Sequence, residues 1–192
     1  MIAILKYNAG NITSVQNALK RIGADCIITN DEVALRNADK VIFPGVGEAN
    51  TAMNFLKQER LDELIKNLQQ PVLGICLGLQ LMCKHSEEAD TAGLNIFNTT
   101  VKKFPDTGIV PHMGWNNIEN TSGELFKNYE ELMDFYFVHS YFAEMSNQAT
   151  ATCNYLLPFA AALQKDNFYA TQFHPEKSGD AGEIILKNFI KL

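Results

Sequence analysis

The stretch of residues 72–80 constrains the fold of this chain more than any other. It begins with a short apolar run, which predicts a buried strand, and apolar residues recur at helical spacing from Leu77 to Cys83. Cys76 therefore lies on the turn between a strand and a helix, with Gly74 and Gly78 on either side. A tight turn of this kind lifts a reactive side chain out of the sheet, as in a nucleophile elbow. The pattern predicts an α/β chain with Cys76 at its functional site.

The chemistry of Cys76 depends on what surrounds its sulfur. The thiolate is the nucleophilic form of a cysteine, and a helix N-terminus and a neighbouring imidazolium both favour it. The predicted elbow provides the helix N-terminus, so a histidine has to come from elsewhere in the chain. The alternative is a small core residue, which is what a cysteine in an apolar stretch usually is. The flanking glycines, together with the histidine described below, favour the nucleophile.

Strands and helices alternate through the first half of the chain. Apolar runs predict strands at 2–7, 26–28, 40–43 and 72–75. Helical spacing predicts helices at 12–22, 33–37 and 77–83, and helical segments from 49 to 68. This order argues for a mostly parallel sheet flanked by helices, whose ligands bind beyond the carboxyl ends of the strands. The second half suggests added antiparallel strands and an amphipathic closing helix at 181–192. Residues 86–92 are polar and acidic and are interpreted as a solvated loop.

Length and charge narrow the class of protein. The 192 residues are 46% hydrophobic, which is enough for one compact domain spanning residues 1–192. The net charge of -6 gives no electrostatic footprint for nucleic acid or an anionic membrane surface. The four cysteines are scattered, so we expect no metal site and no disulfide framework. Residues 1–6 predict a first strand and not a signal peptide, so we expect a cytoplasmic protein. We also expect no cofactor.

A second unusual loop, residues 44–47, directly follows the third predicted strand. Its sequence is Pro-Gly-Val-Gly, and the two glycines let backbone N–H groups turn toward a pocket without hindrance from a Cβ. In acyl transfer such N–H groups can hold an oxyanion. The N–H of Leu77, the residue after the candidate nucleophile, is the second natural donor. An ordinary β-turn is the alternative for this loop.

The histidine that Cys76 requires is found at His174. Glu176 follows two residues later, with Pro175 between them. In an extended chain both side chains point to the same side, so the carboxylate can hold the imidazole in the tautomer that presents its other nitrogen to Cys76. Pro175 stiffens this geometry because its ring fixes φ. The sequence therefore predicts a Cys-His-Glu constellation.

Residues 111–116 interrupt the shorter strands of the second half. They read Pro-His-Met-Gly-Trp-Asn and are expected to form a loop that carries the only tryptophan of the chain. An exposed Trp and Met beside a glycine are typical of a partner-facing patch, and tucked-in loop packing is the alternative. His139 ends a later strand candidate, and on its own we interpret it as a structural histidine.

Several of these motifs together are similar to those of a known family. The elbow at Cys76, the loop 44–47 and the run 174–176 resemble the class I (triad) glutamine amidotransferases. With the further motifs at 111–116 and 137–141, the order and the total length resemble the glutaminase subunits of imidazole glycerol phosphate synthase, of histidine biosynthesis. The resemblance covers essentially the whole chain. It implies a flavodoxin-like, mostly parallel sheet with added antiparallel strands in the C-terminal half.

The resemblance also implies roles for individual residues. Cys76 would attack the side-chain amide of L-glutamine, His174 would protonate the departing ammonia, and Glu176 would orient His174. A thioester on Cys76 would then be hydrolysed to glutamate. The backbone N–H groups of Val46 and Leu77 would hold the tetrahedral oxyanion. The residues that would line the glutamine pocket are Gly45, Gly47, Gly78, Gln80, His139, Ser140 and Tyr141.

A protein partner follows from the same resemblance. The chain would form a heterodimer with a separate cyclase, which would be a TIM barrel through which ammonia would pass to the bound ribulosyl phosphate substrate. The products would be imidazole glycerol phosphate and the aminoimidazole carboxamide ribotide. Glutaminase activity of the chain alone is expected to be weak, because the glycine-rich strand of the family can hold its peptide turned the wrong way. The face toward the cyclase would contain Asn11, His112, Met113, Trp115, Tyr136 and Lys177.

Two other interpretations stay open at this point. A triad amidotransferase serving another synthase, or a stand-alone γ-glutamyl hydrolase, would use the same three residues, although the motif at 111–116 argues against both. A non-catalytic regulatory or redox-sensing α/β domain would use Cys76 as a site of oxidation. Such a domain would not need both His174 and Glu176.

Overall fold

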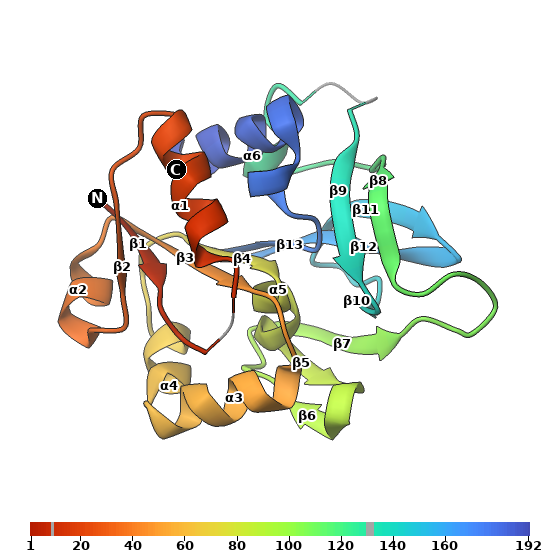
Figure 1. The fold of residues 1–192 in the computed structure, drawn as a ribbon, viewed down its shortest axis with the longest axis horizontal. Coiled ribbons are helices and arrows are strands. Elements are labelled where there is room, and N and C mark those ends of the chain that lie inside the picture. The colour runs from red at the N-terminus through yellow and green to blue at the C-terminus, as the bar shows by residue number, and fades with distance from the viewer. Residues whose placement is uncertain (9, 130–132) are drawn as a thin grey trace.

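The computed structural model describes residues 1–8, 10–129 and 133–192. A seven-stranded sheet forms its centre, with the strand order β11-β12-β13-β4-β3-β1-β2 (Figure 1). Neighbouring strands from β13 to β2 are parallel, and β11 and β12 extend the sheet in antiparallel fashion. The strands are β1 (Ile2–Leu5), β2 (Cys26–Thr29), β3 (Lys40–Gly45), β4 (Val72–Cys76), β11 (Ala149–Tyr155), β12 (Leu157–Lys165) and β13 (Phe168–Thr171). The expected fold class is confirmed.

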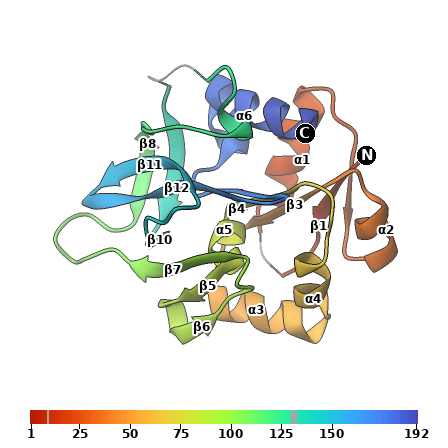
Figure 2. The same cartoon turned by 180° about the vertical axis from the view of Figure 1, so that it is seen from behind.

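Helices cover both faces of the central sheet (Figures 1 and 2). On one face α1 and α6 bury a cluster that contains Leu19, Ile42 and Phe189. On the other face α2 to α5 bury a cluster that contains Phe43 and Leu56. Ile42 and Phe43 belong to different clusters because successive side chains of a strand point to opposite faces. The helices are α1 (Ile12–Arg21), α2 (Glu32–Asn37), α3 (Ala49–Gln58), α4 (Leu61–Lys66), α5 (Leu77–Met82) and α6 (Gly179–Lys191).

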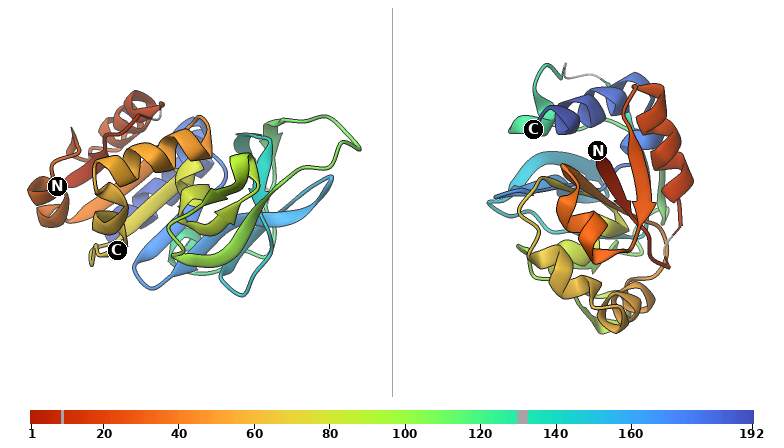
Figure 3. Two further views of the ribbon diagram at one scale, coloured as in Figure 1. Left: turned by 90° about the horizontal axis from the view of Figure 1, so that it is seen from below. Right: turned by 90° about the vertical axis from the view of Figure 1, so that its left-hand side faces the viewer.

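Two smaller sheets extend one side of this three-layer arrangement (Figure 3). One has the strand order β10-β7-β5-β6, and the other is the antiparallel pair of β8 and β9. Their strands are β5 (Cys83–Ser86), β6 (Thr91–Ala92), β7 (Phe97–Lys103), β8 (His112–Asn116), β9 (Phe135–His139) and β10 (Tyr141–Ala143). Short 3-10 turns occur at η1 (Glu88–Asp90), η2 (Glu124–Phe126) and η3 (Pro175–Lys177). No described helix is long and apolar enough to cross a membrane.

Two predicted elements differ from the structure. Most of the expected loop 111–116 is strand β8, because its backbone pairs with β9 from His112 to Asn116. The expected solvated loop 86–92 contains the end of β5, the turn η1 and strand β6. The helical segments expected between residues 49 and 68 are α3 and α4, and Arg60, which adopts a left-handed conformation with φ of 56°, separates them.

The order of the central strands positions the candidate site. β3, β4 and β13 lie side by side and are parallel, so their carboxyl ends meet at one edge of the sheet. Gly45 on β3 is in register with Cys76 on β4, and Ile75 is in register with Thr171 on β13. The loop 44–47, the elbow and the segment 172–176 are therefore brought together by the sheet itself.

Candidate active site

Cys76 lies where β4 passes directly into α5. Its backbone has φ of 53° and ψ of -105°, a combination that a non-glycine residue adopts only under strain. With this backbone conformation the side chain of Cys76 lies at the edge of the sheet, where the residue is 6% exposed. Gly78 makes the turn sterically feasible, because a Cβ at that position would lie 1.9 Å from the carbonyl oxygen of Phe43. The predicted strand-to-helix elbow is present at this cysteine.

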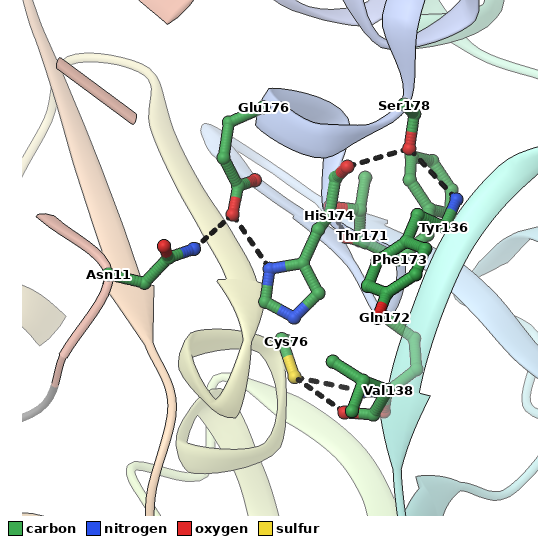
Figure 4. Close-up of polar contacts among 10 residues, drawn as sticks. All are labelled: Asn11, Cys76, Tyr136, Val138, Thr171, Gln172, Phe173, His174, Glu176 and Ser178. Atoms are coloured by element: carbon green, nitrogen blue, oxygen red, sulfur yellow. Dashed lines mark hydrogen bonds and ion pairs between the residues drawn. The ribbon is translucent and has the colours of Figure 1, made fainter. Parts of the chain in front are cut away.

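His174 and Glu176 form a buried pair next to the elbow. The carboxylate oxygen Oε1 of Glu176 lies 2.7 Å from Nδ1 of His174, and both side chains are almost completely buried. Figure 4 shows Nε2, on the other side of the ring, directed toward Cys76. We expected an extended backbone between the two residues, but Glu176 reaches His174 through the 3-10 turn η3. The pairing is as predicted, and its backbone geometry is different.

Neighbouring residues hold this pair in place. The backbone N–H of His174 donates to the carbonyl of Tyr136 at 2.9 Å. The hydroxyl of Ser178 donates to the carbonyl of His174 at 2.6 Å and accepts from the N–H of Tyr136 at 3.0 Å. Asn11 donates its side-chain N–H to Oε1 of Glu176 (Figure 4). The imidazole and the carboxylate are thus fixed from both sides, by β9 and by the start of α1.

The electrostatics of the pair favour a protonated imidazole. Burial alone lowers the pKa of His174, but the neighbouring Cys76, and then Glu176, outweigh this effect and raise the pKa to about 10. Nε2 of His174 and Oε2 of Glu176 have no conventional hydrogen-bond partner among the described residues. An imidazolium that faces a sulfur in a buried site is the arrangement that stabilises a nucleophilic thiolate.

A cavity of about 410 Å³ opens in front of Cys76. Of the residues expected at a pocket or an oxyanion site, it is lined by Val46, Gly47, Leu77, Gln80, His139, Ser140 and Tyr141. It is also lined by Glu88, Pro111 and Val138, which were not predicted. Among the described residues, therefore, the elbow, the loop after β3 and the end of β9 share one concave surface.

Gly45 and Gly78 do not line this cavity, although both were expected to line the pocket. A Cβ at Gly45 would lie 2.2 Å from the hydroxyl of Tyr7, which donates to the carbonyl of Pro44 at 2.6 Å. Burial, and then the charge of Cys76, raise the pKa of Tyr7, so this hydroxyl keeps its proton. Both glycines allow close packing of the backbone behind the site.

His139 lines the cavity, but both of its ring nitrogens are engaged within the protein. Nδ1 lies 2.7 Å from the carbonyl of Tyr141 and must donate to it, which leaves Nε2 to accept from Nδ1 of His112 at 3.1 Å. Burial lowers the pKa of His139 to about 3 and that of His112 to about 4, so both rings are neutral. His139 therefore has no free nitrogen for a ligand.

Glu88 places a carboxylate at the cavity. Its Oε2 accepts from the N–H of Ala49, at the first turn of α3, at 2.8 Å. Burial raises the pKa of Glu88, a hydrogen bond from Ala49 opposes this rise, and the charge of Glu48 adds to it. We missed Glu88 because the acidic stretch 86–92 has the composition of a solvated loop. The 3-10 turn that directs it inward has no clear signal in the sequence.

Gln172 was also missed, and it contacts the sulfur. Its Nε2 lies 3.6 Å from Sγ of Cys76, and the carbonyl of Val138 lies 4.0 Å from the same atom (Figure 4). The side chain of Gln172 is completely buried. Strand alternation gives no firm signal for this residue, because β13 ends at Thr171 and the chain bends at residues 172 and 173.

The residues expected to face a partner separate into two groups. Met113 and Trp115 are 64% and 57% exposed, and the Trp115 ring lies 6.0 Å from the ring of Tyr136 in an edge-to-face arrangement. The ammonium of Lys177 lies 5.6 Å from the centre of the Tyr136 ring. His112, in contrast, is buried, because it alternates with Met113 along β8 and points inward.

Comparisons with known proteins find relatives along the whole chain. The model of the family described as glutamine amidotransferase class-I matches residues 4–192. The imidazole glycerol phosphate synthase subunit HisH of Bacteroides thetaiotaomicron is 58% identical over 100% of this chain and 99% of its own length. The subunit of the same name from Haemophilus influenzae is 45% identical over 99% of this chain and 96% of its own length.

Solved structures with the same fold are more distant in sequence. A putative GMP synthase protein from Thermoplasma acidophilum matches with a TM-score of 0.74 at 21% identity, over 100% of this chain and 92% of that chain. PurLQS from Thermotoga maritima matches with a TM-score of 0.72 at 13% identity, over 99% of this chain and 97% of that chain. At these identities the likeness concerns the fold alone.

Proposed function

Because the chain belongs to the class-I glutamine amidotransferase family, in the branch of the imidazole glycerol phosphate synthase subunits HisH, we propose that it is the glutaminase subunit of that synthase. It hydrolyses L-glutamine to glutamate and ammonia and delivers the ammonia to a cyclase subunit in histidine biosynthesis. The observation that carries this proposal is the buried pair of His174 and Glu176 beside Cys76, whose side chain lines the cavity. A structural cysteine would not need this pair beside it.

The first half of the reaction uses the thiolate and the imidazolium. Sγ of Cys76 attacks the side-chain carbonyl carbon of glutamine, and the carbonyl oxygen becomes an oxyanion. Nε2 of His174 gives its proton to the amide nitrogen as the C–N bond breaks, so ammonia leaves and a glutamyl thioester remains on Cys76. Glu176 keeps the imidazole in place through Nδ1, at 2.7 Å, and stabilises its charge.

The second half returns the enzyme to its starting state. His174, now neutral, takes a proton from a water molecule that attacks the thioester carbon. Glutamate and the thiolate of Cys76 separate as the C–S bond breaks, and the imidazole is again protonated. The same three side chains therefore serve both steps with opposite proton transfers. This cycle needs no metal or organic cofactor.

Backbone N–H groups hold the oxyanion in both steps. We assign this role to Val46, in the loop after β3, and to Leu77, at the start of α5; both residues line the cavity. One well-placed donor contributes about 3 kcal/mol to the stability of such a transition state. Leu77 gains further from the N-terminus of its helix, where the backbone N–H groups are unpaired.

The remainder of the cavity recognises the amino-acid end of glutamine. Ser140 and Tyr141 provide polar groups on one wall, and Gln80 provides a side-chain amide. We assign the carboxylate of Glu88 to the α-ammonium of the substrate, because it is the acidic side chain among the lining residues. Burial raises the pKa of Glu88 and so disfavours its charged form. The positive charge of an ammonium in the cavity would favour the charged form and so oppose this effect.

The partner of this glutaminase is a separate cyclase subunit, which we take to be a TIM barrel. The exposed side chains of Met113 and Trp115, with Tyr136 and Lys177 beside them, form the face for it. Ammonia passes through the barrel to the bound ribulosyl phosphate substrate. The heterodimer acts in the cytoplasm, with neither a membrane nor a nucleic acid as partner, and residues 1–192 act as a single domain.

Glutamate release from glutamine tests this function. The purified chain is assayed alone, and with a cyclase subunit and the nucleotide substrate of the synthase or a close analogue. We expect a low basal rate that rises strongly only with partner and ligand, and no turnover in a Cys76→Ala variant. Strong turnover without a partner would point to a stand-alone hydrolase. No turnover under any condition would overturn the glutaminase assignment and favour a regulatory domain.

A further inference from the structure

We propose that Gln172 is a second hydrogen-bond donor to the reacting sulfur of Cys76, in addition to His174. The side-chain Nε2 of Gln172 lies 3.6 Å from Sγ, within the range of an N–H···S hydrogen bond. Gln172 is completely buried, so water does not compete for its amide. Gln172 and His174 belong to one segment, and Figure 4 shows the contacts drawn from the sulfur on a different side of it from the imidazole.

The direction of this hydrogen bond follows from the groups behind Gln172. The carbonyl of Tyr141 can only accept, so the side-chain atom of Gln80 that lies 2.8 Å from it must be the donor Nε2. The same Nε2 lies 3.1 Å from Gln172, whose facing atom must therefore be the acceptor Oε1. The NH₂ end of Gln172 is then left to face Cys76. One backbone carbonyl fixes the orientation of both amides.

The two ionisation states of the sulfur have different partners. A thiol at Cys76 can donate to the carbonyl of Val138, which lies 4.0 Å away. A thiolate can only accept, and the N–H of Gln172 is then the matching group. A hydrogen bond to the charged form of a group favours that form. The amide of Gln172 therefore matches the thiolate form of the sulfur, and the carbonyl of Val138 matches its thiol form.

This donor has a chemical role that His174 cannot fill. When the thioester is hydrolysed, His174 acts as the base, so its neutral Nε2 is engaged with water and not with the sulfur. Until Nε2 has taken a proton from that water, the imidazole has none to offer the thioester sulfur, and in that interval the sulfur needs a donor that does not depend on the proton of the histidine. The amide of Gln172 is such a donor, since it carries its N–H groups at every stage. This part of the inference rests on the proposed glutaminase function.

Alkylation by iodoacetamide measures the donor directly, without glutamine or a partner. The folded chain is treated at neutral pH, and the modification of each cysteine is followed by peptide mass spectrometry. In Gln172→Met, which keeps the bulk but loses the donor, we expect Cys76 to be alkylated about tenfold more slowly, equivalent to about 1.4 kcal/mol. The partly buried Cys26 is the internal control, and its rate stays unchanged.

Matched variants separate this role from simple packing. Thr171→Val removes another buried hydrogen bond, from Oγ1 to the carbonyl of Phe173 at 3.0 Å, without touching the sulfur. It should leave the alkylation of Cys76 unchanged. Gln172→Glu keeps an acceptor for Gln80 but presents no N–H to the sulfur, so it should slow alkylation at least as much as Gln172→Met.

The outcomes distinguish this inference from the proposed function. Equal alkylation rates of Cys76 in the wild type and in Gln172→Met overturn the donor role, whatever the glutaminase assay shows. If Gln172→Met does not fold, the rate in Gln172→Glu decides in the same way. Slow alkylation in both variants supports the donor even where no glutamine is hydrolysed, in which case only the proposed function fails.

Discussion

At the scale of single residues, the candidate site is a set of buried polar groups whose hydrogen-bond directions are nearly all determined. The carbonyl of Tyr141 accepts from both His139 and Gln80, and it thereby sets the tautomer of one and the amide orientation of the other. Oε1 of Glu176 sets the role of Nδ1 in His174. What remains directed at Cys76 is one imidazole nitrogen and one amide. The sulfur thus faces these two groups, as well as the carbonyl of Val138, before any substrate arrives.

The titration of His174 tests this description. In the wild type, burial lowers the pKa of the ring, but Cys76 and then Glu176 raise it to about 10, so the ring is protonated at neutral pH. Cys76→Ala removes the strongest group that raises the pKa, so His174 should lose its proton at a distinctly lower pH. NMR of histidine-labelled protein measures both titrations. An unchanged midpoint in Cys76→Ala would contradict the coupling between sulfur and imidazole.

At the scale of elements, the sequence predicted those parts of the site whose signals are local. The elbow follows from its glycines, and His174 with Glu176 follows from their spacing. Glu88 was missed because nothing in an acidic stretch distinguishes a carboxylate directed inward by a 3-10 turn from one in solvent. His112 was wrongly expected on the exposed partner face, because we predicted a loop there. In the strand β8 side chains alternate between the two faces, and His112 points inward. Long-range pairing, here between β8 and β9, decides such cases.

The junction of β4 and α5 is the element on which the site depends most. Gly78→Ala would place a methyl group 1.9 Å from the carbonyl oxygen of Phe43, a backbone atom that cannot move away. We expect a loss of about 3 kcal/mol in the free energy of unfolding, because the helix must shift from the sheet. Chemical denaturation measures this loss, and alkylation of Cys76 reports the accompanying displacement.

A second glycine provides the control for this substitution. Gly23 has φ of 76°, but a Cβ there would have nothing within 4 Å. Gly23→Ala should therefore cost only the backbone strain, about 1 kcal/mol, and should leave the reactivity of Cys76 unaltered. If the two variants lose equal stability, the contact between residue 78 on α5 and the carbonyl of Phe43 on β3 is not the reason that a glycine is needed at position 78.

At the scale of the whole molecule, the site and the proposed partner face are connected by the same strands. On β9, the ring of Tyr136 lies against the ring of Trp115 on the exposed side. The backbone carbonyl of Tyr136 accepts a hydrogen bond from the N–H of His174. On β8, Met113 and Trp115 point outward while His112 points inward to His139 at the cavity wall. A partner that binds the exposed side of this strand pair therefore acts on elements that also hold the imidazole.

Trp115 gives a direct measurement of that binding. It is the only tryptophan of the chain and is 57% exposed, so its emission should shift to the blue when a cyclase subunit covers it. Trp115→Phe serves for subtraction of the partner's own signal. Trp115→Ala should weaken association by about 2 kcal/mol, roughly 30-fold, as a central aromatic contact does. Val33→Ala, which removes a 65% exposed side chain on α2, should not change the affinity. Equal affinities for both alanine variants would place the partner on another face.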